Sequence, residues 1–207
     1  AAGPEGCART HITIASVRFP APSLRYTEAR WNFTVETVMS IACAICASDH
    51  HYMDHPEVAL ADRSGMRVSD PSRDVVMGHE FSGTIVENKA GAAFTRGDRV
   101  VMATSVACGT CVYCRRGWRN LCANVRPMGF GYNGGMAEYV AIPELAVRGG
   151  HVITVPAAVN PVHAALAEPV SCAVNACENS QVRTGDTVLV MGAGPMGILN
   201  AAVAREF

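Results

Sequence analysis

Four cysteines in a short stretch constrain the fold of this chain more than any other feature. Cys108, Cys111, Cys114 and Cys122 fall within fifteen residues, and four thiolates from one loop build a tetrahedral structural zinc site with Zn–S distances of about 2.3 Å. Such a site leaves the ion no open position. We therefore expect it to hold together a lobe at about residues 105–125 and to do no chemistry. The alternative is a set of buried free thiols.

The cysteine count also indicates the compartment. The 207 residues include nine cysteines, an odd number, and cysteines two residues apart rarely pair with each other. A secreted disulfide scaffold would be smaller and poorer in aliphatic residues, whereas this chain is 49% apolar. We therefore expect reduced thiols and a cytoplasmic protein with a substantial core.

Charge and hydropathy exclude two classes of partner. The formal net charge of −1 gives no field that would collect nucleic acid or an anionic membrane. Arg115, Arg116 and Arg119 flank the cysteines, but three arginines on a loop are usually a solvated face. The most apolar stretch, residues 187–204, is interrupted by glycines and a proline, which argues against a transmembrane span. We expect neither a nucleic-acid nor a membrane partner.

Hydrophobic patterning predicts a β-rich region followed by an α/β unit. Runs rich in β-branched residues, or following glycine turns, predict strands at residues 34–43, 75–86, 97–102, 136–142 and 151–155. Residues 50–74 are predicted to be a turn-forming segment. Helix formers follow Pro161, and we expect Pro169 to split or kink the run that ends at Cys177. A buried parallel strand at 187–191 and a helix at 195–206 follow.

Separate residues suggest a second, catalytic metal site. A catalytic zinc takes mixed nitrogen, sulfur and oxygen ligands and keeps one position for water or substrate. Cys46, His79 and a carboxylate from Glu80 or Glu168 would supply such a set. In a regular strand Glu80 would point away from His79, so Glu80 requires a local bend, which the adjacent Gly78 permits. Either glutamate could instead form an ordinary ion pair or lie at a helix end.

A glycine-rich turn follows the strand predicted at 187–191. Its residues are Gly192, Gly194, Pro195, Met196 and Gly197, and a helix begins within it. Glycines in this context let backbone amides approach a pyrophosphate at the helix N-terminus, which predicts binding of NAD or NADP. The alternative is a tight strand-to-helix turn without a ligand. The acidic residue that would contact the ribose is expected about twenty residues further on, beyond Phe207.

Taken in order, these motifs resemble those of the zinc-dependent medium-chain alcohol dehydrogenases, and most closely their sorbitol and threonine dehydrogenase-like branch. The stretch CAICASDHH at residues 43–51 is similar to the family's first signature, and Gly78-His79-Glu80 to its second. The four cysteines match its structural-zinc lobe. Further matches are a Gly-Asp-Arg-Val turn at 97–100, Glu168-Pro169-Val170-Ser171, and the glycine turn at 192–197.

The resemblance implies a fold, an activity and roles for the residues. It implies a GroES-like, β-rich catalytic domain over residues 1–181 and the start of a Rossmann domain over 182–207, hence a mixed β and α/β fold. It implies oxidation of an alcohol or polyol by NAD(P), with one catalytic and one structural zinc. Cys46 and His79, with Glu80 or Glu168 or both, would bind the catalytic zinc, and Ser48 and His51 would relay the alcohol proton.

Two alternative functions remain open, and the resemblance also bears on the oligomeric state. One rival is a truncated, catalytically silent fragment whose zinc sites serve structure or interaction. The other keeps the enzyme class but changes the substrate to threonine or an aldehyde adduct. Members of the family are dimers or tetramers, so the resemblance also implies a homo-oligomer.

Overall fold

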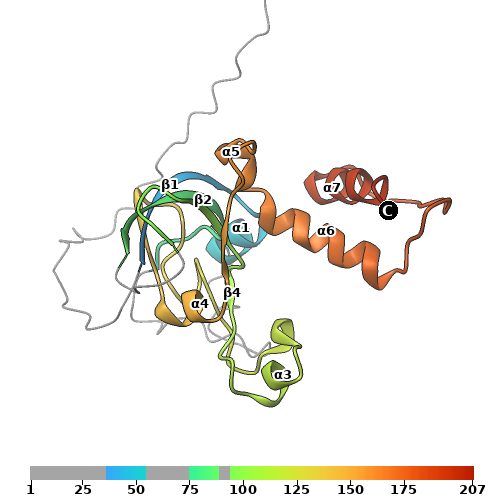
Figure 1. The fold of residues 1–207 in the computed structure, drawn as a ribbon. Coiled ribbons are helices and arrows are strands. Elements are labelled where there is room, and N and C mark those ends of the chain that lie inside the picture. The colour runs from blue at the N-terminus through green and yellow to red at the C-terminus, as the bar shows by residue number, and fades with distance from the viewer. Residues whose placement is uncertain (1–35, 55–74, 89–93) are drawn as a thin grey trace, which may run out of the picture. The chain divides into compact units, whose positions relative to one another are not determined.

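The structure, a computed structural model, describes residues 36–54, 75–88 and 94–207, and its main feature is a curved antiparallel sheet followed by helices (Figure 1). Five strands lie in the order β6-β1-β2-β3-β7, and each neighbouring pair is antiparallel. Their bounds are β1 Glu36–Ala44, β2 Glu80–Asn88, β3 Arg99–Met102, β6 Tyr139–Ile142 and β7 Val152–Thr154. All five predicted strands are confirmed with shifted bounds, and residues 75–79 lie before β2 rather than in it.

A two-stranded ribbon and a small lobe interrupt this sheet in the sequence between β3 and β6. The ribbon pairs β4 (Ser105–Val106) with β5 (Arg126–Pro127). Between these two strands lie α3 (Val112–Arg115) and the 3-10 helix η1 (Arg119–Leu121), which project away from the sheet with the cysteine-rich loop (Figure 1). The lobe predicted at about residues 105–125 is therefore a distinct structural element.

Alternation along the strands builds the core. In β6 the burial alternates, so that Val140 and Ile142 are buried while Tyr139 is exposed. Val140 pairs with Val38 of β1, and both belong to one buried cluster with Phe81 of β2. Two register shifts in the β1–β2 ladder curve the sheet where it wraps this cluster. Three of the metal-ligand candidates, Cys46, His79 and Glu80, lie where β1 ends and β2 begins.

The helices follow the order expected, and they differ in detail. Residues 50–54, predicted as part of a turn segment, complete α1 (Ala47–Asp54), whereas residues 55–74 lie outside the described residues. α4 (Glu144–Arg148) precedes β7, and α5 (Pro161–Ala164) precedes α6 (Ala167–Asn179). Pro169 lies in the first turn of α6, where a missing N–H costs no helical hydrogen bond, so the break falls before it rather than at it. No helix in the described ranges combines the length and apolar character that crossing a bilayer requires.

The strand predicted at 187–191 is wrong for this structure. These residues belong to neither sheet, and Leu189 and Met191 are 84% and 90% exposed. A parallel strand exists only through its ladder with neighbours, and none of the described strands pairs with this segment. The helix predicted after it is confirmed as α7 (Pro195–Ala204), two residues shorter than expected.

His151 gives the fold a measurable pH dependence. It is buried, and its Nδ1 lies 3.2 Å from the Ala103 carbonyl. Burial lowers the pKa of His151, the Ala103 carbonyl raises it, and Arg119 lowers it again, for a net decrease. The folded chain therefore keeps this imidazole neutral where the unfolded chain, with a pKa of about 6.5, already binds a proton. The resulting stability is complete above about pH 6.5 and is lost as the pH falls below it.

We expect His151→Gln to flatten the fall in unfolding free energy between pH 7.5 and pH 5.5, measured by urea denaturation. Zinc release also weakens the protein in acid, so the informative quantity is the difference in slope between the variant and the wild type. Equal slopes in the two proteins would show that His151 does not contribute.

Candidate metal centres

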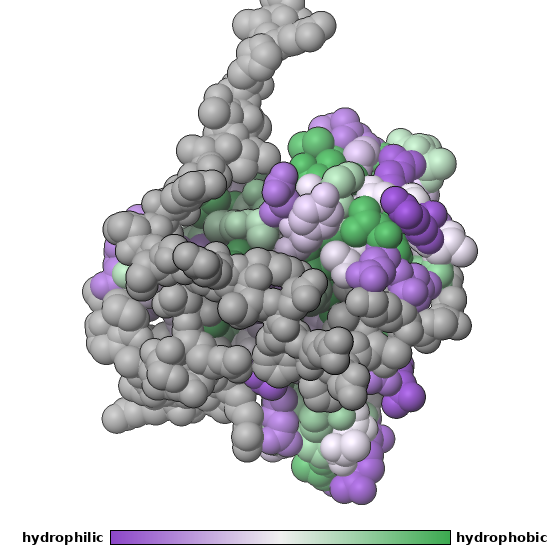
Figure 2. Space-filling model, turned by 90° about the vertical axis from the view of Figure 1, so that its left-hand side faces the viewer, coloured by the Kyte–Doolittle hydropathy of each residue, from purple (hydrophilic) through white to green (hydrophobic). Residues whose placement is uncertain are grey.

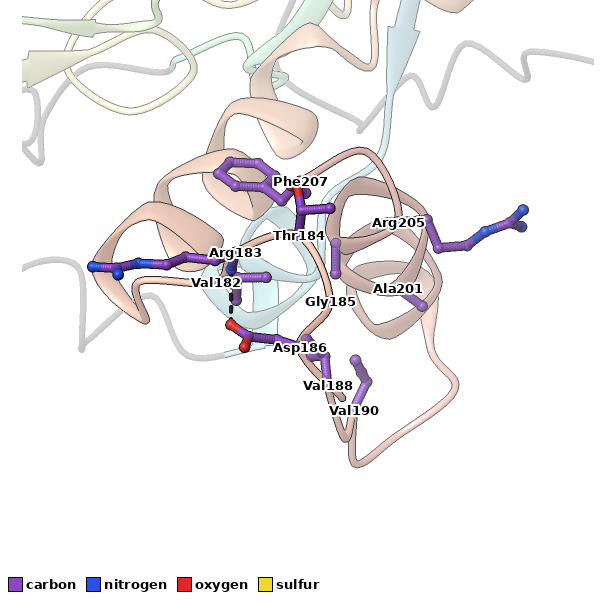
Figure 3. Close-up of a pocket in the computed structure, with 11 residues that line it drawn as sticks. Val182, Arg183, Thr184, Gly185, Asp186, Val188, Val190, Ala201, Arg205 and Phe207 are labelled. Carbon is purple, nitrogen blue, oxygen red and sulfur yellow. Dashed lines mark hydrogen bonds between the residues drawn. The ribbon is translucent and has the colours of Figure 1, made fainter.

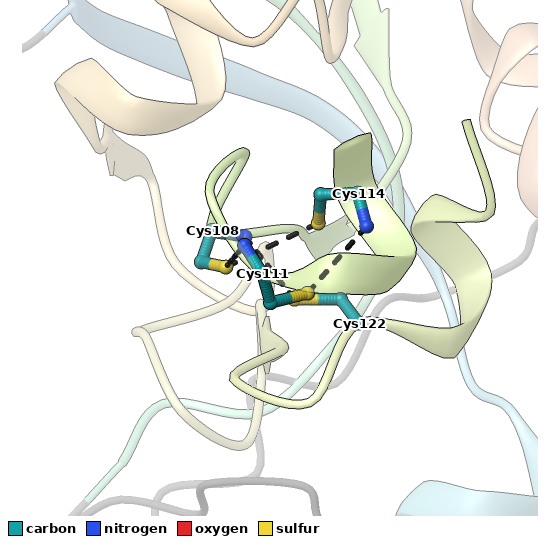
Figure 4. A group of neighbouring side chains, drawn as sticks. All are labelled: Cys108, Cys111, Cys114 and Cys122. Atoms are coloured by element: carbon teal, nitrogen blue, oxygen red, sulfur yellow. Dashed lines mark hydrogen bonds between the residues drawn. The ribbon is translucent and has the colours of Figure 1, made fainter. Parts of the chain in front are cut away.

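The four clustered cysteines converge on one point in the lobe (Figure 4). Their sulfur atoms all lie within 4.8 Å of one another, with 4.0 Å from Cys108 to Cys114 and 4.0 Å from Cys111 to Cys122. Four sulfurs about 2.3 Å from one ion in a tetrahedron lie about 3.8 Å apart. The spacing and the donor type therefore fit a zinc ion bound by four thiolates.

The loop is folded so that backbone amides point at the sulfurs. The amide of Cys111 donates to the Cys108 sulfur at 3.4 Å, and the amide of Cys114 donates to the Cys111 sulfur at 3.5 Å. The latter contact also caps α3 at its N-terminus. The amide of Cys108 donates to Cys122 at 3.2 Å. Hydrogen bonds to sulfur favour the thiolate form, which is the form that binds a metal.

The four thiols cannot all be charged without a cation. The pKa of Cys108 is lowered to about 5 by hydrogen bonds to its sulfur. The largest contribution comes from the Thr110 backbone amide, followed by the Thr110 side chain and the Cys111 amide. Desolvation, followed by the neighbouring Cys111 and Cys122, raises the pKa of Cys114 to about 12. The protein thus stabilises some thiolates at the expense of others. A divalent ion at the centre removes this conflict, which supports the same assignment.

The surface of the lobe carries mixed chemistry. Figure 2 shows it at the lower edge of the molecule, with hydrophobic and hydrophilic residues side by side. Its exposed apolar side chains include Tyr113, Trp118 and Leu121. The guanidinium of Arg116 lies 5.7 Å from the centre of the Trp118 ring, a cation–π contact.

A second group of ligands lies where β1 ends and β2 begins. Cys46, His79 and Glu80 each place one ligand atom within 4.8 Å of the others. The sheet explains the convergence: Ala44, the last residue of β1, pairs with Glu80, the first residue of β2, and Cys46 follows two residues later. His79 and Glu80 are 8% and 6% exposed, so both are held inside the protein.

Gly78 supplies the bend that Glu80 requires. It has a φ of +96°, a conformation that residues with a side chain rarely adopt. β2 begins only at Glu80, so His79 and Glu80 are not successive residues of a regular strand and can face the same point. The structure therefore places Glu80 with Cys46 and His79, while Glu168 lies outside this close group.

Asp49 belongs to this centre and is absent from the sequence prediction. It is 1% exposed, its Oδ2 accepts a hydrogen bond from the Cys46 amide at 2.9 Å, and its Oδ1 lies 3.3 Å from His79 Nδ1. Burial lowers the pKa of His79, but the Asp49 carboxylate, with Glu168 and Glu80, more than offsets this and raises it. A carboxylate at Nδ1 orients the imidazole and leaves Nε2 for a metal. The signal in the sequence was an acidic residue three positions after a ligand cysteine.

The remaining predicted site residues surround the three ligands. Ser48 Oγ lies 3.3 Å from His79 Nε2, and His51 lies on the exposed side of α1. Burial raises the pKa of Glu168, and the charge of His79 partly offsets this increase. Glu168 therefore interacts electrostatically with a residue of the centre. The Cys172 sulfur lies 3.9 Å from Glu168 Oε1.

Aromatic rings border one side of His79. The Phe130 ring lies 5.2 Å from the imidazole, centre to centre, and the Tyr52 ring lies 5.1 Å from Phe130 in an edge-on arrangement. Both rings are half-buried. They give the centre an apolar wall that the sequence pattern did not indicate.

The glycine-rich turn leads into α7 as predicted. Gly194 caps the helix, Pro195 and Met196 form its first turn, and an added side chain at Gly197 would collide with the carbonyl of Gly192. A nearby cavity of about 440 Å³ is lined by residues on both sides of this turn but not by the turn itself (Figure 3). The hydrogen bond from the Arg183 amide to Asp186 at 2.8 Å shapes its wall. This cavity therefore differs from the predicted nucleotide site.

Comparison with known proteins extends these observations. Residues 36–157 match the family profile described as the alcohol dehydrogenase GroES-like domain. D-xylulose reductase A of Aspergillus oryzae is 38% identical over 170 residues, 79% of this chain and 42% of the relative. L-threonine 3-dehydrogenase of Pyrococcus abyssi is 35% identical over 166 residues, 80% of this chain and 44% of the relative. The chain thus spans less than half the length of these relatives.

A solved structure agrees in fold. A protein from Sinorhizobium meliloti, assigned as a zinc-binding dehydrogenase and solved with NADP bound, superimposes with a TM-score of 0.70 at 32% identity, covering 84% of this chain and 46% of that one. The mixed β and α/β fold class expected from the sequence is confirmed by this likeness and by the family match. Because the family profile covers more than half of its residues, this chain belongs to the zinc-dependent medium-chain alcohol dehydrogenase family, through its GroES-like domain.

Proposed function

We propose that this chain carries the metal centres and part of the nucleotide site of an NAD(P)-linked alcohol or polyol dehydrogenase. The observation that carries the proposal is the convergence of Cys46, His79 and Glu80, three unlike ligands that leave a metal position open. The cysteine lobe, with four sulfurs, has no such opening and is assigned a structural zinc.

Neighbouring residues orient the ligands of the open centre. Asp49 holds the His79 ring so that Nε2 is available, and Gly78 turns Glu80 inward. Glu168, whose pKa burial raises and His79 lowers, is the second candidate carboxylate for this centre. When bound, zinc supplies a Lewis acid for the alcohol oxygen, and the nicotinamide accepts the hydride from the alcohol carbon.

A proton must also leave the alcohol. Ser48 Oγ lies 3.3 Å from His79 Nε2, which supports a role for this hydroxyl next to the metal position. His51 lies one helical turn further along α1 on its exposed side. We assign Ser48 the first transfer and His51 the release to solvent, so that hydride and proton leave in different directions.

The nucleotide would bind at the start of α7. Residues 1–181 form the catalytic domain in this proposal, and 182–207 form the first unit of the Rossmann domain. Gly192 and Gly194 face open space and permit close approach of a pyrophosphate to the helix N-terminus, where Pro195 and Met196 form the first turn. Gly197 permits close packing of this turn against the Gly192 carbonyl. The Sinorhizobium meliloti protein, solved with NADP bound, supports a nicotinamide cofactor. The proposal admits NAD or NADP.

The relatives named above support small polyols as substrates, and threonine or an aldehyde adduct remains the second candidate because of the Pyrococcus abyssi enzyme. We also propose a cytoplasmic homo-oligomer. The odd number of cysteines and their two-residue spacings support a reducing compartment.

The test is a spectrophotometric assay of the zinc-loaded protein with NAD⁺ or NADP⁺ at 340 nm, using xylitol, sorbitol, ethanol and L-threonine. We expect reduction of the nucleotide with a polyol, and loss of this activity in Cys46→Ser. A protein that binds two zinc ions but reduces neither nucleotide with any of these substrates would be the catalytically silent alternative.

A further inference from the structure

The three residues that precede His79 are held by a second segment, residues 133–136, and together we call these two segments the clamp. Gly134 donates its amide to the Val76 carbonyl at 2.6 Å, Met136 to Met77 at 3.0 Å, and Gly135 to Gly78 at 2.8 Å. The Asn133 side chain accepts from the Val76 amide at 3.1 Å. Each residue from 76 to 78 is thus bonded immediately before the chain reaches His79 and Glu80.

The two segments of the clamp approach this closely because residues 134 and 135 are glycines. An added Cβ at Gly134 would collide with the Gly78 carbonyl and lie 2.6 Å from the Met77 carbonyl. An added Cβ at Gly135 would lie 2.5 Å from Phe81 Cβ. Neither glycine has a positive φ, so the requirement is close approach rather than backbone conformation.

The clamp packs partly on the core, because Gly135 lies against Phe81 and its carbonyl accepts a hydrogen bond from Ser40 Oγ at 3.1 Å. Its other bonds join the backbone of residues 76–78, and Asn133 contributes an exposed amide. What the clamp fixes is the path of the chain through Gly78, whose φ of +96° directs His79 and Glu80 to the same point. A small change in that path would separate two of the three ligands.

We propose that residues 133–136 are a positioning element that sets the geometry and affinity of the Cys46–His79–Glu80 metal centre. The inference rests on the proposed function, since it assumes a metal at that centre. Residues 133–136 act through the backbone of 76–78 and are not among the three ligands. Replacing residues that orient metal ligands without binding the metal themselves typically lowers metal affinity by about 10–100-fold.

The experiment is a Co²⁺ titration of the whole chain followed by visible absorption. Subtracting the Co²⁺ spectrum of Cys46→Ser from that of the wild type gives the absorption band of the open centre. The intense sulfur-to-cobalt band that remains in Cys46→Ser reports the cysteine lobe. We expect Asn133→Ala to weaken Co²⁺ binding at the open centre by about tenfold, with the lobe band and the melting temperature unchanged. Asn133→Asp, which keeps the acceptor oxygen, is expected to bind Co²⁺ as wild type does.

Glycine variants give a stronger version with a matched control. Gly134→Ala is expected to abolish the band of the open centre while the lobe band persists. Gly149→Ala, at the end of α4, introduces a milder collision, 2.7 Å from the His151 ring and 2.8 Å from the Leu145 carbonyl, at a residue that belongs to neither ligand group. We expect Gly149→Ala to lower the melting temperature and to keep both bands. If Gly134→Ala does not fold, the Asn133 pair decides.

The outcomes separate the two proposals. An unchanged open-centre affinity in Asn133→Ala, or equal weakening of both sites, would overturn the positioning role while leaving the metal centre intact. A wild-type chain without any open-centre band would overturn the proposed function, and this inference with it.

Discussion

Cys108→Ser is expected to leave one zinc ion per chain instead of two and to lower the melting temperature sharply. The four sulfurs of the lobe lie within 4.8 Å of one another, so a serine leaves three sulfurs and one weak oxygen donor around the ion. Structural zinc in small peptides binds with apparent free energies of about 10–16 kcal/mol, and that free energy is folding free energy. Zinc analysis of the purified variant and a thermal melt measure both effects.

Cys177→Ser is the matched control for this change. Cys177 is a buried thiol of α6 that belongs to neither ligand group. The same replacement there is expected to keep both zinc ions and to cost only the stability of one substituted core side chain. If Cys108→Ser retained two zinc ions and melted with the wild type, the lobe would not be a metal site.

His79→Ala is expected to remove the other zinc ion, and with it the proposed dehydrogenase activity, while the lobe keeps its metal. The physical reason is twofold. The centre loses its only nitrogen ligand, and Asp49, 1% exposed, loses the ring that faces its Oδ1 at 3.3 Å. Removing one partner of a buried ion pair typically costs about 3–5 kcal/mol, because the remaining charge stays buried without compensation.

A double variant isolates the second effect. In His79→Ala/Asp49→Ala the stranded carboxylate is gone, so part of the lost stability should return, although the Cys46 amide then loses its acceptor. Urea unfolding of the wild type, both single variants and the double variant gives the coupling energy. A coupling energy near zero between the two substitutions would contradict the assigned pairing.

Local sequence signals were sufficient to predict the strands of the sheet and the cysteine-rich lobe. β6 is predictable because Val140 and Ile142 alternate with exposed residues, and the lobe because four cysteines lie in one loop. The strand predicted at 187–191 failed for a different reason. Its apolar residues satisfy the pattern, but a parallel strand depends on neighbours that no local window contains, and none of the described strands pairs with it.

The metal centre was only partly predictable. Cys46 and His79 stood out as ligand types, yet the choice between Glu80 and Glu168 depended on the backbone at Gly78, which the sequence allowed but did not determine. Asp49 went unassigned because a buried acidic partner looks the same in sequence as a solvated helix residue. The clamp at 133–136 was invisible for a similar reason: its bonds join backbones more than fifty residues apart.

The most direct test of the account is the zinc content of the purified protein, determined by mass spectrometry against protein concentration. Two unlike ligand groups, one closed and one open, predict two zinc ions per chain. A wild-type chain that contains a single zinc ion, lost on replacing Cys108 and retained on replacing Cys46, would contradict the claim that Cys46, His79 and Glu80 form a metal centre.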